Sequence, residues 1–277
     1  WTLEGAEAVC SGEGIEAGLI LDLLAQLVNK SLVVMTEVNG ESRYHSLETI
    51  RQYGREKLFE TDEAAPIRDR HLDYYIQLAE QGFEELHGPN DLSWIGKLDT
   101  ENDNFRSALS WSLESPDLDP QKALQLSGAL QDYWDTRGYT KEGFQWLSEA
   151  LKRAPDAPTS QRCTALVGAG LLSIRLSRFK EATQIQKEAL QLARRLKNAP
   201  LIIISLAYLV AEGLNLVDPR KMFEESVALA RATRNQFYLA ELLWLGSIGI
   251  SENALETSSF IEEAREIAEK LGNTRLR

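Results

Sequence analysis

The sequence predicts a mainly all-α protein, in which one short β-hairpin near the start is followed by a long array of paired helices. Three observations support this fold class. Apolar residues recur at helical spacing along most of the chain. A single Asn-Gly pair, at residues 39 and 40, lies between two short stretches rich in β-forming residues. Beyond residue 120, a Glu followed by a small residue recurs at spacings of 39, 37 and 38 residues.

The β-hairpin belongs to a small first domain, for which we expect residues 1–62. Residues 15–30 form an amphipathic helix, whose apolar face comprises Leu19, Leu23, Leu24, Leu27 and Val28. The next two stretches, SLVVMTE and SRYHSL, can pair around Asn39-Gly40, the strongest short-range signal for a type I′ hairpin. The stretch ETIRQYGREKL then returns to helical spacing. Helix, hairpin and helix form the later part of a winged-helix module, which can be incomplete at its N-terminus.

Residues 63–120 are expected to link the two domains and to form the first helices of the array. One long helical pattern runs from Ile67 to Leu86 and ends at the turn formers His87-Gly88-Pro89-Asn90. One or two further helices follow between Leu92 and Leu113. The prolines at positions 116 and 120 then interrupt the helical pattern.

Residues 121–277 carry the repeat. Each unit is a helix pair whose second helix contains one of the dipeptides Glu149-Ala150, Glu188-Ala189, Glu225-Ser226 and Glu263-Ala264. Another small residue follows four positions later, at Ala154, Ala193, Ala230 and Ala268. A period of this length, built from helix pairs, indicates an α-solenoid. Tetratricopeptide units are about 34 residues long. We therefore interpret these units as elongated tetratricopeptide-like repeats, about four helix pairs in an α-α superhelix.

The charge distribution argues against two classes of partner. The formal net charge is -12, and residues 1–120 hold 24 acidic and 9 basic side chains against 18 and 21 in residues 121–277. A phosphate backbone is bound by clustered Lys and Arg, so we expect no direct contact with nucleic acid. No uninterrupted apolar stretch approaches the length of a transmembrane helix, and no secretory signal is present, so we expect a cytoplasmic protein without a membrane contact.

The sequence contains no motif for catalysis, phosphate binding or metal binding. No G-x-x-x-x-G-K-[ST] or G-x-S-x-G stretch occurs, and the three histidines do not fall at metal-ligand spacing. The two cysteines cannot form a disulfide framework or a four-thiolate zinc site, and we expect both to be reduced. We therefore expect no catalytic residue, no metal ligand and no cofactor in this segment. A carboxylate pair in a cleft of the helical array stays open as a weaker alternative.

Aromatic residues gather around an arginine in the first repeat, at Tyr133, Trp134, Arg137, Tyr139 and Trp146. Two interpretations stay open. The side chains can pack at the junction of two domains. They can also form an effector or partner pocket on the concave face of the superhelix, because Trp, Tyr and Arg are typical anchors of binding sites.

Four segments, in a fixed order, resemble one protein family. They are LLAQLVNKSLVV from residue 23, RYHSLETIRQYGREKL from residue 43, RDRHLDYYIQLAE from residue 68 and LDTENDNFRSALSWSLE from residue 98. The ordered set resembles the bacterial signal-transduction ATPases with numerous domains, of NB-ARC type, which are often named LuxR-like or AfsR-like transcriptional regulators. The resemblance covers roughly residues 1–150. The later repeats match only in their period and in the positions of small residues.

The resemblance implies a regulatory role without catalysis in this segment. In that family an ATPase domain precedes a winged helix and a tetratricopeptide-like superhelix, and a DNA-binding domain lies at one end. The implied partners are the protein's own nucleotide-binding domain and a small-molecule or protein effector bound by the superhelix. ADP or ATP is expected only in the full-length protein.

The resemblance also implies nucleotide contacts at one helix start. Relatives in plant and animal immunity carry a Met-His-Asp motif there, and the aligned residues here are Ser46-Leu47-Glu48. Leu47 replaces the histidine, so Glu48 and Arg51 are the candidate contacts. A stand-alone tetratricopeptide-like adaptor, with the winged helix as a cap, is the alternative function. A phosphate-binding loop upstream would favour the regulator.

Overall fold

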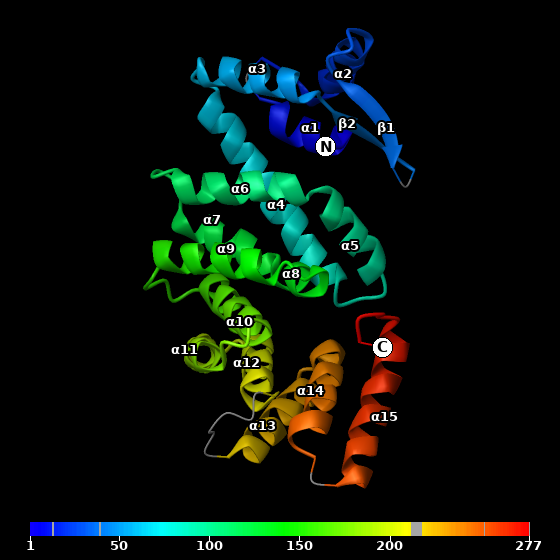
Figure 1. Cartoon of the computed structure of the whole chain (residues 1–277), viewed down its shortest axis with the longest axis vertical. Coiled ribbons are helices and arrows are strands. Elements are labelled where there is room, and N and C mark those ends of the chain that lie inside the picture. The colour runs from blue at the N-terminus through cyan, green and yellow to red at the C-terminus, as the bar shows by residue number, and fades with distance from the viewer. Residues whose placement is uncertain (13, 39, 212–217, 252, 277) are drawn as a thin grey trace. The chain divides into compact units, whose positions relative to one another are not determined.

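The computed structural model of the chain describes residues 1–277 except 13, 39, 212–217, 252 and 277. Helices dominate it, and the described residues contain one two-stranded antiparallel sheet (Figure 1). The predicted fold class, mainly all-α with a single hairpin, is confirmed. The chain divides into two compact units, which are described separately below. Unit 1 comprises Trp1–Gln77 with Asp103–Trp111, and unit 2 comprises Leu78–Asn102 with Ser112–Arg277.

Unit 1 begins with helices and contains the hairpin. Its elements are α1 (Leu3–Cys10), a short 3-10 turn (Ala17–Leu19), α2 (Ile20–Asn29), β1 (Val34–Val38), β2 (Glu41–His45), α3 (Glu48–Phe59) and the first part of α4 (Ala64–Glu85). The helix predicted from residue 15 begins only at Ile20, because Gly12 and Ile15 exchange backbone hydrogen bonds of 3.0 and 3.1 Å. The strand predicted from residue 31 begins at Val34, since Ser31 and Leu32 still donate to carbonyls of α2.

The hairpin has the predicted register. Val38 pairs with Glu41, which leaves the two residues 39 and 40 as the turn. Gly40 has φ +81°, a left-handed conformation that glycine adopts without steric cost. Asn39 lies outside the described residues, so the type I′ assignment stays a prediction at that position.

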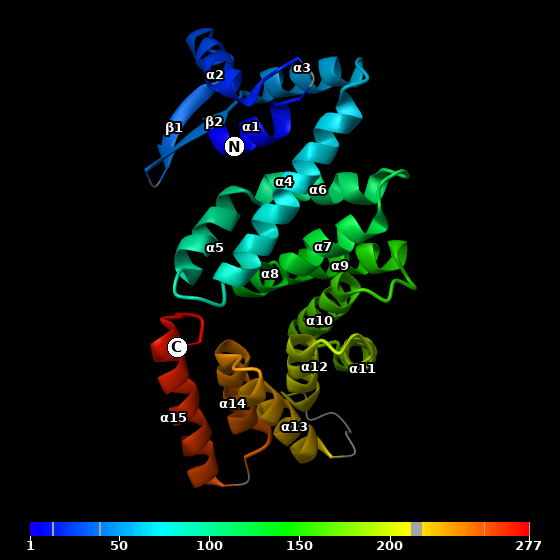
Figure 2. The ribbon, with the colours of Figure 1, turned by 180° about the vertical axis from the view of Figure 1, so that it is seen from behind.

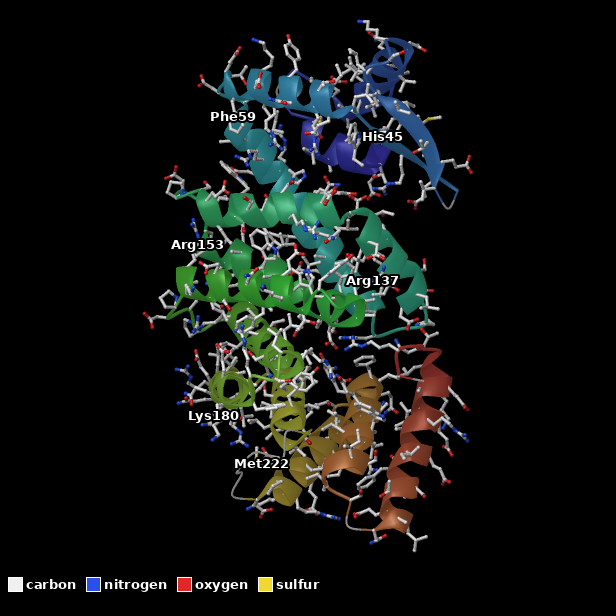
Figure 3. All side chains as sticks on the ribbon, viewed as in Figure 1. His45, Phe59, Arg137, Arg153, Lys180 and Met222 are labelled. Carbon is white, nitrogen blue, oxygen red and sulfur yellow. The ribbon has the colours of Figure 1, made fainter. Side chains whose placement is uncertain are left out.

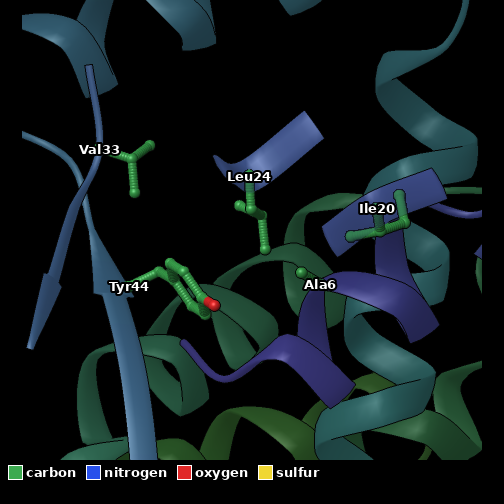
Figure 4. Close-up of a cluster of buried hydrophobic side chains, with 5 residues drawn as sticks. All are labelled: Ala6, Ile20, Leu24, Val33 and Tyr44. Carbon is green, nitrogen blue, oxygen red and sulfur yellow. The ribbon is translucent and has the colours of Figure 1, made fainter. Parts of the chain in front are cut away.

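A small apolar cluster holds the helices of unit 1 against the hairpin. It consists of five buried side chains from α1, α2 and the hairpin region, shown in Figure 4: Ala6, Ile20, Leu24, Val33 and Tyr44. The apolar face predicted for α2 is only partly covered. Leu24 is buried, whereas Leu19, Leu23 and Leu27 stay exposed.

Unit 2 is a run of helices, and from α7 onward each contacts its neighbours in sequence. After the end of α4 and α5 (Asp91–Thr100), the chain passes through α6 (Asn102–Glu114) and continues as α7 (Pro120–Ala129), α8 (Gln131–Arg137), α9 (Thr140–Arg153), α10 (Ser160–Arg175), α11 (Phe179–Leu196), α12 (Ala199–Ala211), α13 (Pro219–Ala232), α14 (Gln236–Gly249) and α15 (Ala254–Leu271). Figure 2 shows the same succession from behind.

The small residues of the repeat lie where helices meet. All eight are buried: Ala150, Ala154, Ala189, Ala193, Ser226, Ala230, Ala264 and Ala268. Burial of small side chains at a constant period lets successive helices approach closely, as the sequence predicts. Two of the glutamates beside them join the second helices of successive repeats: Arg194 of α11 binds Glu225 of α13 at 2.8 Å, and Arg231 of α13 binds Glu263 of α15 at 2.9 Å.

None of the helices in the described ranges combines the length and the apolarity that a bilayer span requires.

Candidate functional site

The two predicted nucleotide contacts lie on the surface of unit 1. Glu48 begins α3, and its Oε2 is 2.6 Å from Nη2 of Arg51 one turn later. Both side chains are more than half exposed. Figure 3 labels Phe59 at the far end of the same helix, and this ring is exposed as well. Glu48 and Arg51 are therefore accessible to another domain or to a ligand.

The predicted aromatic cluster of the first repeat is organised by Asp99 of α5. The buried Tyr133 hydroxyl donates to Asp99 Oδ1 at 3.0 Å, and Arg137 Nε donates to the same oxygen at 3.0 Å. Burial, followed by this hydrogen bond to Asp99, raises the pKa of Tyr133 far above its ordinary value. The Tyr139 ring lies 5.8 Å from that of Tyr133. Arg137, labelled in Figure 3, keeps an accessible side chain.

The two tryptophans of the cluster take different positions. Trp134 is 2% exposed and fills the space beside Gly143, where an added Cβ would lie 2.6 Å from Trp134 Cε3. Trp146 is partly exposed and its Nε1 donates to Glu142 Oε1 at 3.4 Å. Trp134 thus contributes to the packing of its helix pair. The proposed binding role of the cluster rests on Arg137, Tyr139 and Trp146.

A pocket that sequence reasoning did not identify lies inside unit 2. Its volume is about 550 Å³. The walls come from α8, α10, α14, α15 and the residues after α15, and they are Asp135, Thr136, Arg175, Ala240, Glu241, Trp244, Ile261, Ala264, Arg265, Arg275 and Leu276. Pockets for small molecules commonly have about 300–1,000 Å³ and a few convergent polar groups in apolar walls.

One wall of the pocket is held by a turn at the end of the array, residues 272–276, here called the closing turn. It starts at Gly272, which caps α15 with φ +70°. The Asn273 side chain donates to the carbonyls of Leu86 and Gly88 at 2.9 and 2.8 Å. These contacts span 187 and 185 residues of sequence. They therefore connect the last helix of unit 2 with its first turn.

The carboxylate of Asp91 completes the attachment of the closing turn. Its Oδ2 accepts from the Thr274 backbone at 2.8 Å, the Thr274 hydroxyl at 2.6 Å and the Arg275 backbone at 2.9 Å. Asp91 is 3% exposed. A buried carboxylate that accepts several N–H and O–H groups is well satisfied, so the turn is fixed at its base.

A buried charge cluster lies behind the pocket. Asp132 of α8 accepts from Arg275 Nη2 at 3.2 Å, and its Oδ2 lies 2.7 Å from Nε2 of His87. An ionised carboxylate can only accept, so Nε2 carries the proton. Burial alone would raise the pKa of Asp132, but Arg275 and His87 outweigh it and hold that pKa well below its usual value. The His87 ring stacks on Phe237 with centroids 4.1 Å apart.

Two charged side chains of the pocket behave differently from each other. Arg175 is neutralised, because its Nε and Nη2 donate to the two carboxylate oxygens of Asp135 at 2.7 and 3.1 Å. Among the described residues, the Glu241 carboxylate accepts a hydrogen bond from the Tyr208 hydroxyl, at 3.4 Å. Burial raises the pKa of Glu241, with a further contribution from Asp132, and the nearby Arg275 opposes the rise. Charged groups with shifted pKa values in a concave site are candidates for ligand contacts.

The available sequence signal for this pocket was faint. Glu241 is the one charged residue in the apolar stretch QFYLAELLWLG, and Asp132 and Asp135 share one face of a short helix. No local pattern connects either with Arg275, which lies far along the chain. The metal prediction is not changed by the structure: within the described ranges no group of three His, Cys, Asp or Glu side chains could hold an ion.

Comparison with known proteins shows a sequence similarity along nearly the whole chain. No family model matches the chain. Over 98% of its length the chain is 32% identical to a protein of Mycobacterium tuberculosis named "Putative HTH-type transcriptional regulator", and equally to a protein of that name in Mycobacterium bovis. The chain spans 32% of each, about a third of the length of these curated relatives. A shorter stretch of 76 residues is 39% identical to an uncharacterized protein of Mycobacterium tuberculosis, and covers 27% of this chain and 19% of that protein.

The solved structures that the chain matches include one whose name describes its architecture. It is a signal-transduction ATPase with numerous domains and a tetratricopeptide repeat sensor, from Pyrococcus horikoshii. The alignment covers 97% of this chain and 54% of that one, at 15% identity and a TM-score of 0.37. None of these names identifies a ligand.

Proposed function

We propose that the chain is the non-catalytic sensor segment of a transcriptional regulator built as a signal-transduction ATPase. The observation that carries the proposal is its similarity, along 98% of its length, to much longer mycobacterial proteins named as HTH-type transcriptional regulators. Their additional length leaves room for the nucleotide-binding and DNA-binding parts that the segment lacks. The proposed place of action is the cytoplasm, since a regulator of transcription has to reach DNA.

In this proposal unit 1 contacts the nucleotide-binding domain of the same protein. The supporting feature is α3, none of whose described side chains is buried. Leu47, Tyr53 and Phe59 present exposed apolar surface along it, with Glu48 and Arg51 between them. Exposed apolar side chains that gather on one element are typical of interaction surfaces. ADP or ATP would be bound by the partner domain, with Glu48 and Arg51 as the contributions of this chain.

Unit 2 is proposed to receive the effector in its pocket. A ligand shifts a conformational equilibrium only if it binds one state more tightly than the other. The pocket can bind a ligand more tightly in one conformation than in another, because Arg275 and Leu276 of the closing turn form part of its wall. A ligand that contacts both α14 and the closing turn would stabilise the conformation in which this turn is attached to the rest of unit 2. That conformational change would alter the activity of the other domains of the regulator.

The test uses the full-length regulator loaded with a fluorescent ADP analogue. We expect Glu48→Ala to speed ADP release several-fold, because one proposed contact and its ion pair with Arg51 are lost. Glu60→Ala is the matched control. Glu60 forms an ion pair of the same length, 2.6 Å, with Lys57 at the end of α3 and is similarly exposed. Equal release rates for the two variants would contradict the nucleotide role of Glu48.

A protein-binding adaptor is the second candidate, and one feature favours it. Ile248 and Leu255 are 67% and 85% exposed beside the turn between α14 and α15. Large apolar side chains at such exposure can anchor a partner protein. If the gene encodes no phosphate-binding loop outside these residues, and Ile248→Asp abolishes capture of a partner that the wild-type chain binds, the adaptor replaces the regulator.

A further inference from the structure

We propose that the pocket in unit 2 binds a small zwitterion with an apolar side chain, of the class of the α-amino acids leucine and phenylalanine. The inference rests on the proposed sensor function, because it names the chemical class of the effector for that site. Three features of the walls carry it. They are a carboxylate without an ion pair among the described residues, two of the three guanidinium groups in the lining, which have spare donors, and an accessible aromatic surface.

The carboxylate is that of Glu241. It lies in the middle of the apolar helix α14, and no ion pair joins it to a cation within the part of the chain that the structure describes. Arg275 is close enough to act on Glu241 electrostatically but forms no direct bond with it there. A half-buried carboxylate in an apolar helix costs free energy unless a partner satisfies it. A ligand ammonium group would be that partner.

The guanidinium groups belong to Arg175 and Arg275. Arg175 uses Nε and Nη2 to bind Asp135, which leaves Nη1 available, and its side chain is 51% exposed. Arg275 uses Nη2 to bind Asp132, and its buried Nη1 has no hydrogen-bond partner among the described residues. Guanidinium groups favour carboxylate ligands because their planar N–H donors match the two oxygens. The ligand carboxylate would therefore lie beside Arg175 and Arg275.

The third feature is the apolar part of the lining. Trp244 follows Glu241 by one helical turn and is 51% exposed, and Ile261 and Leu276 also line the cavity. An exposed tryptophan next to a carboxylate can contact both a cation and an alkyl or aryl group. A ligand with an apolar side chain would cover this surface.

The balance of charges distinguishes a zwitterion from simpler ligands. A plain amine would satisfy Glu241 and leave Arg175 and Arg275 with unused donors. A plain carboxylate would satisfy the arginines and be repelled by Glu241. A ligand that carries both groups on one carbon can satisfy the carboxylate and the arginines, because Arg275 acts on Glu241 electrostatically and both line the same pocket. The volume of about 550 Å³ is sufficient for such a molecule with a branched or aromatic side chain.

The experiment is calorimetric titration of the chain with L-leucine and with its two truncated analogues. Isoamylamine lacks the carboxylate, and 4-methylpentanoate lacks the ammonium group. We expect leucine to bind at least tenfold more tightly than either analogue. Glu241→Gln should weaken leucine binding at least tenfold and leave the binding of 4-methylpentanoate unchanged or tighter. Glutamine keeps the shape of the side chain and removes a buried charge, so we expect the variant to fold.

The matched control is Glu266→Gln. Glu266 is exposed on α15, where it pairs with Lys270 at 3.6 Å, and it does not line the pocket. This variant should bind leucine as the wild type does. Three results would overturn the proposal: isoamylamine binding as tightly as leucine, equal losses in the two glutamine variants, or no binding of leucine and of L-phenylalanine at millimolar concentration.

The failure of this inference can be separated from the failure of the proposed function. If leucine or phenylalanine binds with the expected pattern but does not change ADP release from the full-length regulator, the pocket assignment stands and the regulatory coupling is wrong. If ADP release responds to another compound while neither amino acid binds, the ligand class is wrong and the sensor function stands.

Discussion

The two units of the chain bury their charges and their apolar residues in different ways. Unit 2 encloses Asp91 and Asp132 and satisfies both with partners from distant parts of the sequence. Unit 1 has a small apolar cluster and leaves large apolar side chains exposed on α2, β1 and α3, among them Leu21, Met35 and Tyr53. The difference shows that unit 2 satisfies buried carboxylates through contacts between distant segments, whereas α3 of unit 1 has none of its described side chains buried.

The largest effect expected from this difference is at Asp132. Replacement of Asp132 by Ala leaves the buried Arg275 without its counter-ion, and loss of one member of a buried pair costs about 3–5 kcal/mol. We expect the free energy of unfolding in urea to fall by that amount. Glu149→Ala is the control, because the exposed pair of Glu149 with Lys152 should contribute at most about 1 kcal/mol. If both variants lost similar amounts of unfolding free energy, the buried ion pair of unit 2 would stabilise it no more than a surface pair does.

The same carboxylate predicts a dependence on pH. The pKa of Asp132 is lower in the folded chain than in the unfolded one, so its contribution to stability is present above the unfolded value. That contribution is lost as the pH falls below about 4 toward the folded value. The difference in unfolding free energy between the wild type and Asp132→Asn should therefore shrink from pH 7 to pH 3. A difference that stays constant over this range would show that Asp132 does not titrate as described.

Replacing a glycine in each unit by alanine tests how tightly the helices of the two units are packed. At Gly143 in unit 2 an added Cβ would lie 2.6 Å from Trp134, and overpacking of this kind costs about 1–3 kcal/mol. At Gly54 in α3 of unit 1 nothing lies within 4 Å of the added Cβ. Alanine there should stabilise by about 0.5–1 kcal/mol, because glycine is a poor helix former. Thermal unfolding of Gly143→Ala and Gly54→Ala should therefore shift in opposite directions, and a shift in the same direction would contradict the difference in packing.

The smallest effect is expected at the surface links between repeats. Arg231 and Glu263 are both well exposed, so Arg231→Ala should change the unfolding free energy by at most about 1 kcal/mol. Added salt should reduce even this difference. A double-mutant cycle with Glu263→Ala measures the pair directly. A coupling free energy well above about 1 kcal/mol would show that this surface ion pair contributes substantially to the stability of unit 2.

Local pattern was sufficient to predict most of the fold. The dipeptide Asn39-Gly40 predicted the hairpin because a two-residue turn depends on its own residues. The repeated Glu and small residues predicted the helix pairs because each contact lies about one repeat away. The exact starts of α2 and β1 were missed, since the hydrogen bonds at Gly12, Ser31 and Leu32 depend on turns that periodicity does not reveal.

The pocket could not be predicted for a related reason. Thr274 and Asp91 meet across 183 residues and Asn273 and Leu86 across 187, and none of them belongs to a recognisable motif. Aromatic composition drew attention to Trp134, but a tryptophan beside a glycine can equally fill a core, as it does here next to Gly143. Single residues such as Glu241 become informative only once the position of Arg275 is known.

The closing turn has a consequence for how unit 2 unfolds. In an open repeat array the terminal repeats contact one neighbour only, so they fray first and the middle survives longer. In unit 2 the hydrogen bonds of Asn273 and Thr274 hold the last helix against the first turn. Neither α15 nor the turn after α4 can then open without breaking the buried polar contacts that join them. Hydrogen exchange in α15 and at the start of α5 should consequently be governed by the same opening event.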